Sequence, residues 1–347
     1  MPMFSPCRLW LYLAPFFLIA CDAEPPVTEL SGLTMGTTYS VKYTGPLDAP
    51  KQQQLHTQIK SELAAINNSM STYLADSEIS RINQRKSQQP IEISAALATV
   101  LAEAANVADL SGGAFDITVG PLVNLWGFGP KTPLPPQKTP DANAITATKA
   151  TTGMDKILLD LHNNRLIKQH PDVYLDLSAI AKGYAVDQLV KLVEAQQIKN
   201  YMVEIGGELR VRGTNAQGTP WRIAIEKPNP DSRTVFQVIE LQDLAVATSG
   251  DYRHYFEING VRYSHTINPR TGKPIDHKLA SVTVLASECM RADALATALM
   301  VLGAEAGMQL AEQQQIPALF IVKTESDFAA KMSSKFNAYI GKANSNN

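Results

Sequence analysis

The chain has 347 residues and a formal net charge of −2, with 31 lysines and arginines against 33 aspartates and glutamates and no basic stripe. This balance argues against nucleic acid as a partner, because binding to a phosphate backbone requires clustered positive charge. The length suffices for one large domain, or for two closely joined domains, with a sizeable core.

The N-terminal segment MPMFSPCRLWLYLAPFFLIACDAE predicts export. Its apolar run, residues 9–20, is too short and too interrupted by Pro15 to span a bilayer, so we interpret residues 1–20 as a secretory signal. LIAC resembles a bacterial lipobox, which implies lipidation of Cys21; a plain signal peptide is the alternative. Asp22 resembles the signal that retains lipoproteins in a Gram-negative inner membrane, so we expect an inner-membrane lipoprotein that faces the periplasm.

Cysteine usage excludes a disulfide framework. If Cys7 is removed with the signal and Cys21 is acylated, Cys289 is the one thiol left in the mature chain. Residues 21–30 contain two prolines and are expected to form a tether between the lipid and the folded domain, which we assign to residues 31–347.

The next elements mix strands and helices without a regular βαβ repeat. LTMGTTYSVKY alternates as a strand, and residues 50–68 and 94–110 have the apolar spacing of amphipathic helices. The Pro-rich residues 129–140 exclude regular structure. They mark either a subdivision of the domain or a long surface loop.

Three turn dipeptides between alternating runs predict β-hairpins, at residues 163–164, 206–207 and 259–260. Towards the C-terminus, MRADALATALMVLG has helical spacing that is expected to end at Gly303, and ALFIVK has the composition of a strand. Hairpins and helices in this mixture favour an α+β fold.

The stretch VYLDLSAIAKGYAVD is the first candidate for chemistry. It begins like an apolar strand, carries Asp176, and continues as a predicted helix with Ser178 at its N-cap and Lys182 in its first turns. The free N–H groups of a helix start attract anions, and a lysine adds a full positive charge, so phosphate suits this corner. The competing interpretation is a simple ion pair between Asp176 and Lys182, because the chain has no Gly-rich phosphate-binding loop.

The second candidate is a pair of oxygen ligands on the predicted C-terminal helix. Asp293 and Thr297 are four residues apart, so their side chains can lie on one face. A carboxylate with a hydroxyl suits Mg²⁺ rather than zinc. The alternative is a purely structural role, in which the aspartate caps the helix and the threonine packs against a neighbour.

The third candidate is His265, which ends an apparent strand directly before an Asn-Pro turn. A histidine in such a place can act as a general base. The six histidines contain no H-x-x-x-H spacing, and the chain has no G-x-S-x-G elbow, which argues against a zinc hydrolase and a serine hydrolase.

Taken together and in order, eight stretches resemble the successive motifs of the ApbE-type FAD:protein FMN transferases: MGTTYSV, MSTYLADSEISRIN, SGGAFDITVGPLVNLW, DLSAIAKGYAVD, EIGGELRVRG, ATSGDYRHYF, SHTINPRTGKPI and ADALATALMVLG. The resemblance covers nearly the whole chain after the tether. It implies a T-fold-like α+β architecture with mixed or antiparallel sheets and packed helices. It also implies Mg²⁺-dependent transfer of the FMN half of FAD to a Ser or Thr hydroxyl of a target protein, with release of AMP.

The resemblance implies an FAD site whose residues are carried over motif by motif. The residues expected to bind FAD are Met35, Tyr73, Ala114, Phe115, Asp116, Asp176, Lys182 and Ile267. Met35 and Tyr73 would contact the flavin or adenine portions, residues 114–116 would form part of the wall, and Ile267 would line the pocket. Asp176 and Lys182 would hold the FAD around its ribose and phosphates.

The same resemblance implies a metal site and a base. The carbonyl of Ala179 would join Asp293 and Thr297 around Mg²⁺, and His265 would take the proton of the acceptor hydroxyl. Family acceptors carry the receiving residue in a short S/T-G-A-T-like motif. This chain contains no such motif, so we expect a separate acceptor protein, such as a membrane redox-complex subunit that faces the periplasm.

Two other functions remain open from the sequence. A Mg²⁺-dependent FAD pyrophosphatase would release FMN and AMP to water, and a lipid-anchored flavin carrier would have no turnover. The set of Asp293, Thr297, Lys182 and His265 favours catalysis, because a carrier needs neither a metal site nor a base. A purely structural lipoprotein would leave these spaced polar motifs unexplained.

Overall fold

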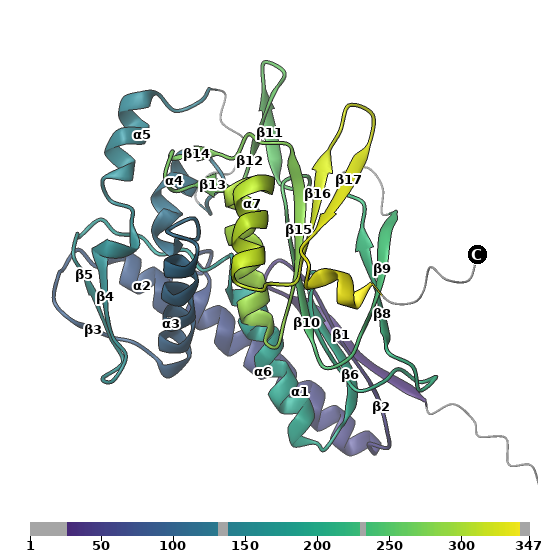
Figure 1. The fold of residues 1–347 in the computed structure, drawn as a ribbon. Coiled ribbons are helices and arrows are strands. Elements are labelled where there is room, and N and C mark those ends of the chain that lie inside the picture. Colours follow the sequence, from purple (N-terminus) through teal and green to yellow (C-terminus); the bar gives the residue numbers. More distant parts are fainter. Residues whose placement is uncertain (1–25, 131–137, 230–233, 341–347) are drawn as a thin grey trace, which may run out of the picture.

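The computed structural model describes residues 26–130, 138–229 and 234–340. The predicted signal segment and Cys21 therefore lie outside the described residues. An eight-stranded sheet forms the centre of the molecule, with every neighbouring pair antiparallel (Figure 1). In order across the sheet, its strands are β1 (Val27–Thr34), β2 (Thr37–Thr44), β6 (Asn200–Ile205), β7 (Glu208–Arg212), β10 (Ala245–Gly250), β15 (Leu279–Ala286), β16 (Ala318–Lys323) and β17 (Phe328–Met332).

Helices cover one face of this sheet, and a hairpin covers the other (Figure 1). The helices on this face are α1 (Ala49–Met70), α6 (Ala181–Ala195) and α7 (Cys289–Gln313), and α3 (Ala95–Leu110) packs against α1 and α7. The hairpin consists of β8 (Trp221–Glu226) and β9 (Val235–Leu241). Strand β15 lies between the two layers and is buried along seven of its eight residues. The architecture confirms the predicted α+β class.

The stretch predicted as one strand, LTMGTTYSVKY, contains a turn, so that prediction is wrong. The chain reverses at Met35 and Gly36, whose φ angles are 48° and 73°, between β1 and β2. Positive φ at both central residues is typical of the tight turns that match the twist of a hairpin. The alternation of side chains on both sides, together with a methionine where Asn or Gly is usual, concealed the turn.

The three hairpins predicted from turn dipeptides are confirmed. They are β4 (Ile157–Asp160) with β5 (Arg165–Lys168), β6 with β7, and β11 (Tyr255–Ile258) with β12 (Val261–Ser264). A short strand, β3 (Ile91–Glu92), joins β5 to complete a three-stranded sheet. The turn after His265 forms a further small ladder of β13 (Ile267–Asn268) with β14 (Lys273–Pro274).

The two predicted amphipathic helices begin at side-chain caps. Asp48 accepts a hydrogen bond from Lys51 N (2.9 Å) at the start of α1, and Ser94 accepts one from Leu97 N (3.2 Å) at the start of α3. Such caps satisfy N–H groups that have no partner within the helix. The remaining helical segments are α2 (Glu78–Gln84), η1 (Ile117–Val119), α4 (Gly120–Leu125), α5 (Ala142–Lys149), η2 (Met154–Lys156) and η3 (Phe336–Tyr339).

The predicted strand and cap around residues 173–180 do not form. The backbone there joins no ladder: Leu175 N donates to the side chain of Asn83 (2.7 Å). Ser178 does not cap α6; its hydroxyl donates to the carboxylate of Asp176 (2.5 Å), and α6 begins further on without a side-chain cap. Alternate residues of the segment are buried, which gave an irregular loop the pattern of a strand.

The predicted end at Gly303 is confirmed as a break in helix α7. Gly303 leaves the helical path, with φ 81° and ψ 177°, yet helical structure resumes as far as Gln313. The carbonyl of Met300, in the turn before the break, accepts a hydrogen bond from His277 Nε2 (2.9 Å). By length and composition α7 could cross a membrane, but it packs against α3, α6, β10 and β15, as the core helix of a globular domain does.

Candidate active site

A cleft with a volume of about 800 Å³ opens where strand ends, turns and helix starts meet. Its walls come from the tip of the β1–β2 hairpin, the segment after α1, the start of α6, the β6–β7 turn, the end of β10 and the face of α7. Every residue predicted to bind FAD, bind the metal or take the proton lines this cleft: Met35, Tyr73, Ala114, Phe115, Asp116, Asp176, Ala179, Lys182, His265, Ile267, Asp293 and Thr297.

One ammonium group and two carboxyl groups meet in the wall of the cleft. Lys182 Nζ lies 3.4 Å from Glu208 Oε2 and 3.9 Å from Asp293 Oδ1, and the two carboxyl side chains are each only 5% exposed. Burial raises the pKa of both Glu208 and Asp293, and Lys182 opposes this rise. With both carboxyls ionised the cluster carries one excess negative charge, which either a proton or a bound cation can relieve.

The described oxygen atoms fit a magnesium ion. Asp293 Oδ2 accepts a hydrogen bond from Gly183 N (3.0 Å), while Oδ1 faces Lys182. The hydroxyl of Thr297 lies 2.9 Å from that of Ser249, and either hydroxyl can donate. When Thr297 donates to Ser249, the lone pairs of Thr297 are available to a cation.

The small number of protein ligands is also typical of magnesium. In the part of the chain that the structure describes, no three His, Cys, Asp or Glu side chains gather as a metal site. Mg²⁺ is commonly held by one or two protein carboxylates and completes its octahedron with waters and substrate phosphates. A carboxylate, a hydroxyl and a backbone carbonyl beside an open cleft fit that pattern.

The ring of His265 is fixed in a form that can accept a proton. Its Nδ1 lies 3.0 Å from the backbone oxygen of His254. A carbonyl only accepts, so Nδ1 carries the hydrogen of the neutral ring and Nε2 keeps a free lone pair. Burial, and secondarily the neighbouring His254, lower the pKa of His265 to about 4. The imidazole is therefore neutral at neutral pH.

We expect the imidazole of His265 to titrate near pH 4 instead of near its ordinary pKa of 6.5. The unfolded chain would take up this proton near pH 6.5, so acidification from 6.5 towards 4 favours the unfolded state. A proton–carbon NMR titration of the FAD-free protein measures the value, with the resonance assigned by its absence from His265→Ala. A midpoint near 6.5 would contradict the geometry of this site.

The other predicted residues differ in how they meet the cleft. Tyr73 is 69% exposed, whereas Ala114 and Phe115 are buried in the wall. Asp116 also has a local task, since it accepts hydrogen bonds from the backbone and the hydroxyl of Thr118 (2.8 and 2.6 Å) and caps η1.

The simple ion pair between Asp176 and Lys182 does not form. Asp176 accepts hydrogen bonds from the backbone and side chain of Ser178, while Lys182 lies against Glu208 and Asp293. The lysine therefore belongs to the wall of the cleft, where its side chain is 28% exposed.

Two cleft residues whose side chains contact predicted site residues were not singled out in the sequence. Glu208 follows the Gly206-Gly207 turn, and Ser249 lies near the end of β10. Both belong to stretches used for the family resemblance, EIGGELRVRG and ATSGDYRHYF. A carboxylate at a buried position directly after a hairpin turn was the available signal for Glu208.

Comparisons with known proteins identify the family of this chain. Residues 35–320 match the model of the ApbE family. An FAD:protein FMN transferase from Vibrio cholerae is 49% identical over 337 residues, which cover 96% of this chain and 100% of that protein. One from Haemophilus influenzae is 49% identical over 325 residues, covering 92% and 93%. The solved structure of the flavin transferase ApbE from Vibrio cholerae has a TM-score of 0.83 at 49% identity, and the match covers 91% of this chain and 99% of that one.

Proposed function

Because the chain belongs to the ApbE family and is an FAD:protein FMN transferase, we propose that it transfers FMN to a Ser or Thr hydroxyl of a separate protein with the help of Mg²⁺. The observation that carries this proposal is the composition of one cleft, which brings Lys182, Asp293, Thr297 and His265 onto the same walls. These groups match what phosphoryl transfer needs, namely positioning, charge neutralisation and a base.

In this proposal the protein holds FAD along the cleft. Met35 and Tyr73 contact its aromatic portions, Ala114, Phe115, Asp116 and Ile267 form the wall, and Asp176 lies near the ribose and phosphates. Lys182 would donate a hydrogen bond to a pyrophosphate oxygen while it keeps its carboxylate neighbours, for which its three N–H donors and its 28% exposed side chain suit it. The pyrophosphate would then lie between Lys182 and His265, which line the same cleft.

The reaction forms one bond and breaks one. The acceptor oxygen bonds to the phosphorus of the FMN half, and the bond from that phosphorus to the bridging oxygen breaks, so AMP leaves with the bridging oxygen and its electron pair. Nε2 of His265 takes the hydroxyl proton as the oxygen attacks. Water is the competing nucleophile, and an acceptor that fills the cleft excludes it.

The proposed metal site consists of Asp293, Thr297 and the carbonyl of Ala179. A magnesium ion bound there would neutralise charge on the pyrophosphate as the bond breaks. The excess negative charge of the Lys182–Glu208–Asp293 cluster supports a cation at this place. Hydrogen bonds from Gly183 N to Asp293 and between the hydroxyls of Ser249 and Thr297 orient these two side-chain ligands.

Weighing the acceptor by mass spectrometry tests the proposal. The protein from Asp22 onward is incubated with FAD, Mg²⁺ and a periplasmic acceptor domain that bears an S/T-G-A-T-like motif. We expect a mass gain that matches FMN, lost when Mg²⁺ is chelated and lost when the motif's hydroxyl residue is changed to alanine. FMN and AMP in solution beside an unchanged acceptor would favour the pyrophosphatase, and bound, intact FAD would favour the carrier.

We also propose that the protein works as an inner-membrane lipoprotein on redox subunits that face the periplasm. The support is the LIAC segment with Asp22 after Cys21, and the lack of an acceptor motif in this chain. Fractionation of cells that produce the wild type and Cys21→Ala tests the location. A membrane fraction that retains both proteins equally would rule out an anchor at Cys21.

A further inference from the structure

Helices α6 and α7 supply Lys182, Asp293 and Thr297, and neither helix is capped by its own N-cap residue. The positions before the two helices, Ile180 and Glu288, make no side-chain hydrogen bond to the helix. The first N–H groups of a helix have no partner within it and carry partial positive charge. Buried helix starts therefore need acceptors from elsewhere.

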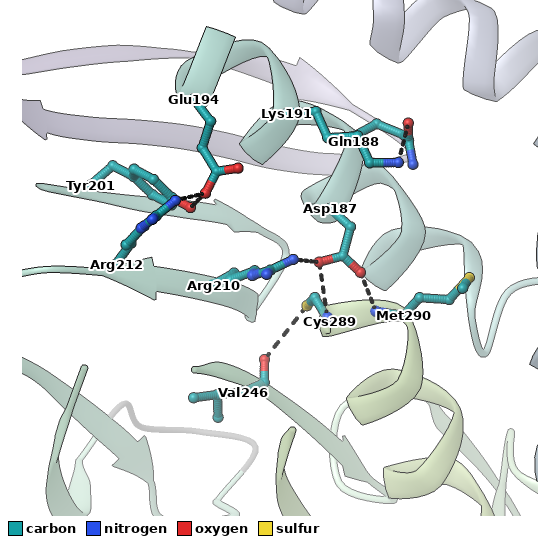
Figure 2. Close-up of polar contacts among 10 residues, drawn as sticks. All are labelled: Asp187, Gln188, Lys191, Glu194, Tyr201, Arg210, Arg212, Val246, Cys289 and Met290. Atoms are coloured by element: carbon teal, nitrogen blue, oxygen red, sulfur yellow. Dashed lines mark hydrogen bonds and ion pairs between the residues drawn. The ribbon is translucent and has the colours of Figure 1, made fainter. Parts of the chain in front are cut away.

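Each helix receives a carboxylate from the other. Asp187 of α6 accepts hydrogen bonds from Cys289 N (3.0 Å) and Met290 N (2.9 Å), the first residues of α7. In return, Asp293 of α7 accepts one from Gly183 N (3.0 Å), in the first turn of α6. Figure 2 shows Asp187 directed at the start of α7. The two helix starts are thus joined by reciprocal capping.

The backbones of the two helices are also in direct contact at this point. A Cβ atom added to Gly183 would lie 2.4 Å from the carbonyl oxygen of Cys289. Only glycine, which has no Cβ atom, permits this close contact between the two backbones. The contact restricts movement of α7 along α6. The position of Asp293, one turn further along α7, depends on this contact.

A third element is tied to the same carboxylate. Arg210 of β7 forms an ion pair with Asp187 Oδ1 (2.9 Å), and the Asp187 side chain is 9% exposed (Figure 2). Strand β7 begins at Glu208, the second carboxyl partner of Lys182. Asp187 therefore joins the three elements that supply Lys182, Asp293 and Glu208, although it does not line the cleft itself.

We infer that Asp187 is a positioning residue for the metal site: it fixes the first turn of α7 so that Asp293 presents one oxygen to Gly183 and the other to the cation. The inference rests on the proposed role of Asp293 as a ligand. Ligand positions in metal sites must hold to a few tenths of an ångström, and groups that orient the ligands affect metal affinity about tenfold to a hundredfold.

The test uses Asp187→Asn, with Glu194→Gln as a matched control. Both carboxylates lie on α6 and pair with an arginine of β7, since Glu194 binds Arg212 (2.5 Å), but Glu194 contacts no residue of α7 in its hydrogen bonds or ion pairs (Figure 2). An asparagine at position 187 keeps the shape but turns an NH₂ group towards one of the two N–H donors.

The readout is FAD binding followed by flavin fluorescence, without acceptor, during a titration with Mg²⁺ and again in chelator. For Asp187→Asn we expect a Mg²⁺ midpoint raised about tenfold to a hundredfold, with FAD affinity in chelator changed by less than about threefold. For Glu194→Gln we expect the wild-type midpoint. Thermal melting of both variants shows whether their losses of stability are comparable.

The outcomes separate this inference from the proposed function. If FAD binding to the wild type does not respond to Mg²⁺, the proposed metal site fails. If the wild type responds and Asp187→Asn has the same midpoint as the wild type, the inference about Asp187 is wrong. Should Asp187→Asn fail to fold, Asp187→Glu is measured instead, because it keeps the charge but displaces the carboxylate relative to the N–H groups of Cys289 and Met290. An unchanged midpoint in that variant overturns the inference.

Discussion

Asp293→Ala is expected to remove Mg²⁺-dependent flavin transfer, with a loss in kcat/KM of at least about a hundredfold, since one charged group at a phosphoryl-transfer site contributes a few kcal/mol to the barrier. The substitution removes the one carboxylate among the proposed metal ligands. It also leaves Lys182 with Glu208 as its remaining carboxyl neighbour. The measurement is the rate of acceptor mass gain over a range of Mg²⁺ concentrations.

A second variant separates the two tasks of this side chain. Asp293 also caps α6 through Gly183 N, so the alanine variant loses a buried hydrogen bond as well as a ligand. Asp293→Asn can keep the hydrogen bond to Gly183 while it loses the charge, and we expect it to melt closer to the wild type but to transfer nearly as slowly as the alanine variant. Undiminished Mg²⁺-dependent turnover in Asp293→Ala would exclude this residue from the site.

His265→Ala is expected to bind FAD with nearly the wild-type affinity and to transfer FMN about a hundredfold to ten-thousandfold more slowly. The reason is that the free Nε2 accepts the hydroxyl proton, whereas the ring holds FAD only as one part of a large wall. Flavin fluorescence measures the affinity, and a single-turnover reaction with excess enzyme measures the chemical step.

His254→Ala is the matched control for this prediction. It removes the neighbouring imidazole but keeps the backbone carbonyl that orients His265 through Nδ1. We therefore expect most of the transfer rate to remain. Loss of FAD binding in His265→Ala would instead assign a structural role to the ring, within the contacts that it makes with Phe128 and His254.

Local patterns predicted the elements whose causes are local. Alternation and turn dipeptides located three hairpins, and the spacing of apolar residues located α1, α3 and the start of α7. The predictions were wrong or incomplete where a tertiary contact determines the backbone conformation. Residues 173–180 alternate like a strand, but their hydrogen bonds go to Asn83 and Ile117, which are distant in the sequence. The break at Gly303 was predicted, whereas the second helical segment that follows it was not. The composition of a single stretch does not contain these contacts.

The residues of the site also divide into those whose proximity the sequence could predict and those whose proximity it could not. Asp293 and Thr297 are four residues apart on one helix, so their shared face could be predicted. Glu208 meets Lys182 from another element, and Asp187 meets Cys289 across 102 residues, so no spacing rule could pair them. The family resemblance supplied the cleft residues by motif. It did not indicate that α6 and α7 cap one another.

Strand β1 relates the cleft to the membrane. It runs from Val27 to the hairpin tip at Met35 that lines the cleft, so residues 27–30, predicted as part of the tether, belong to the sheet instead. Its eight residues span about 26 Å at roughly 3.3 Å per residue. With Cys21 lipidated as proposed, the chain between the anchor and the hairpin tip consists of the residues from Cys21 to Val27 and the whole of this strand. The length of this chain segment sets an upper limit on the height above the bilayer at which the hairpin tip can meet an acceptor, so the anchored enzyme would act only on hydroxyl groups that lie below that limit.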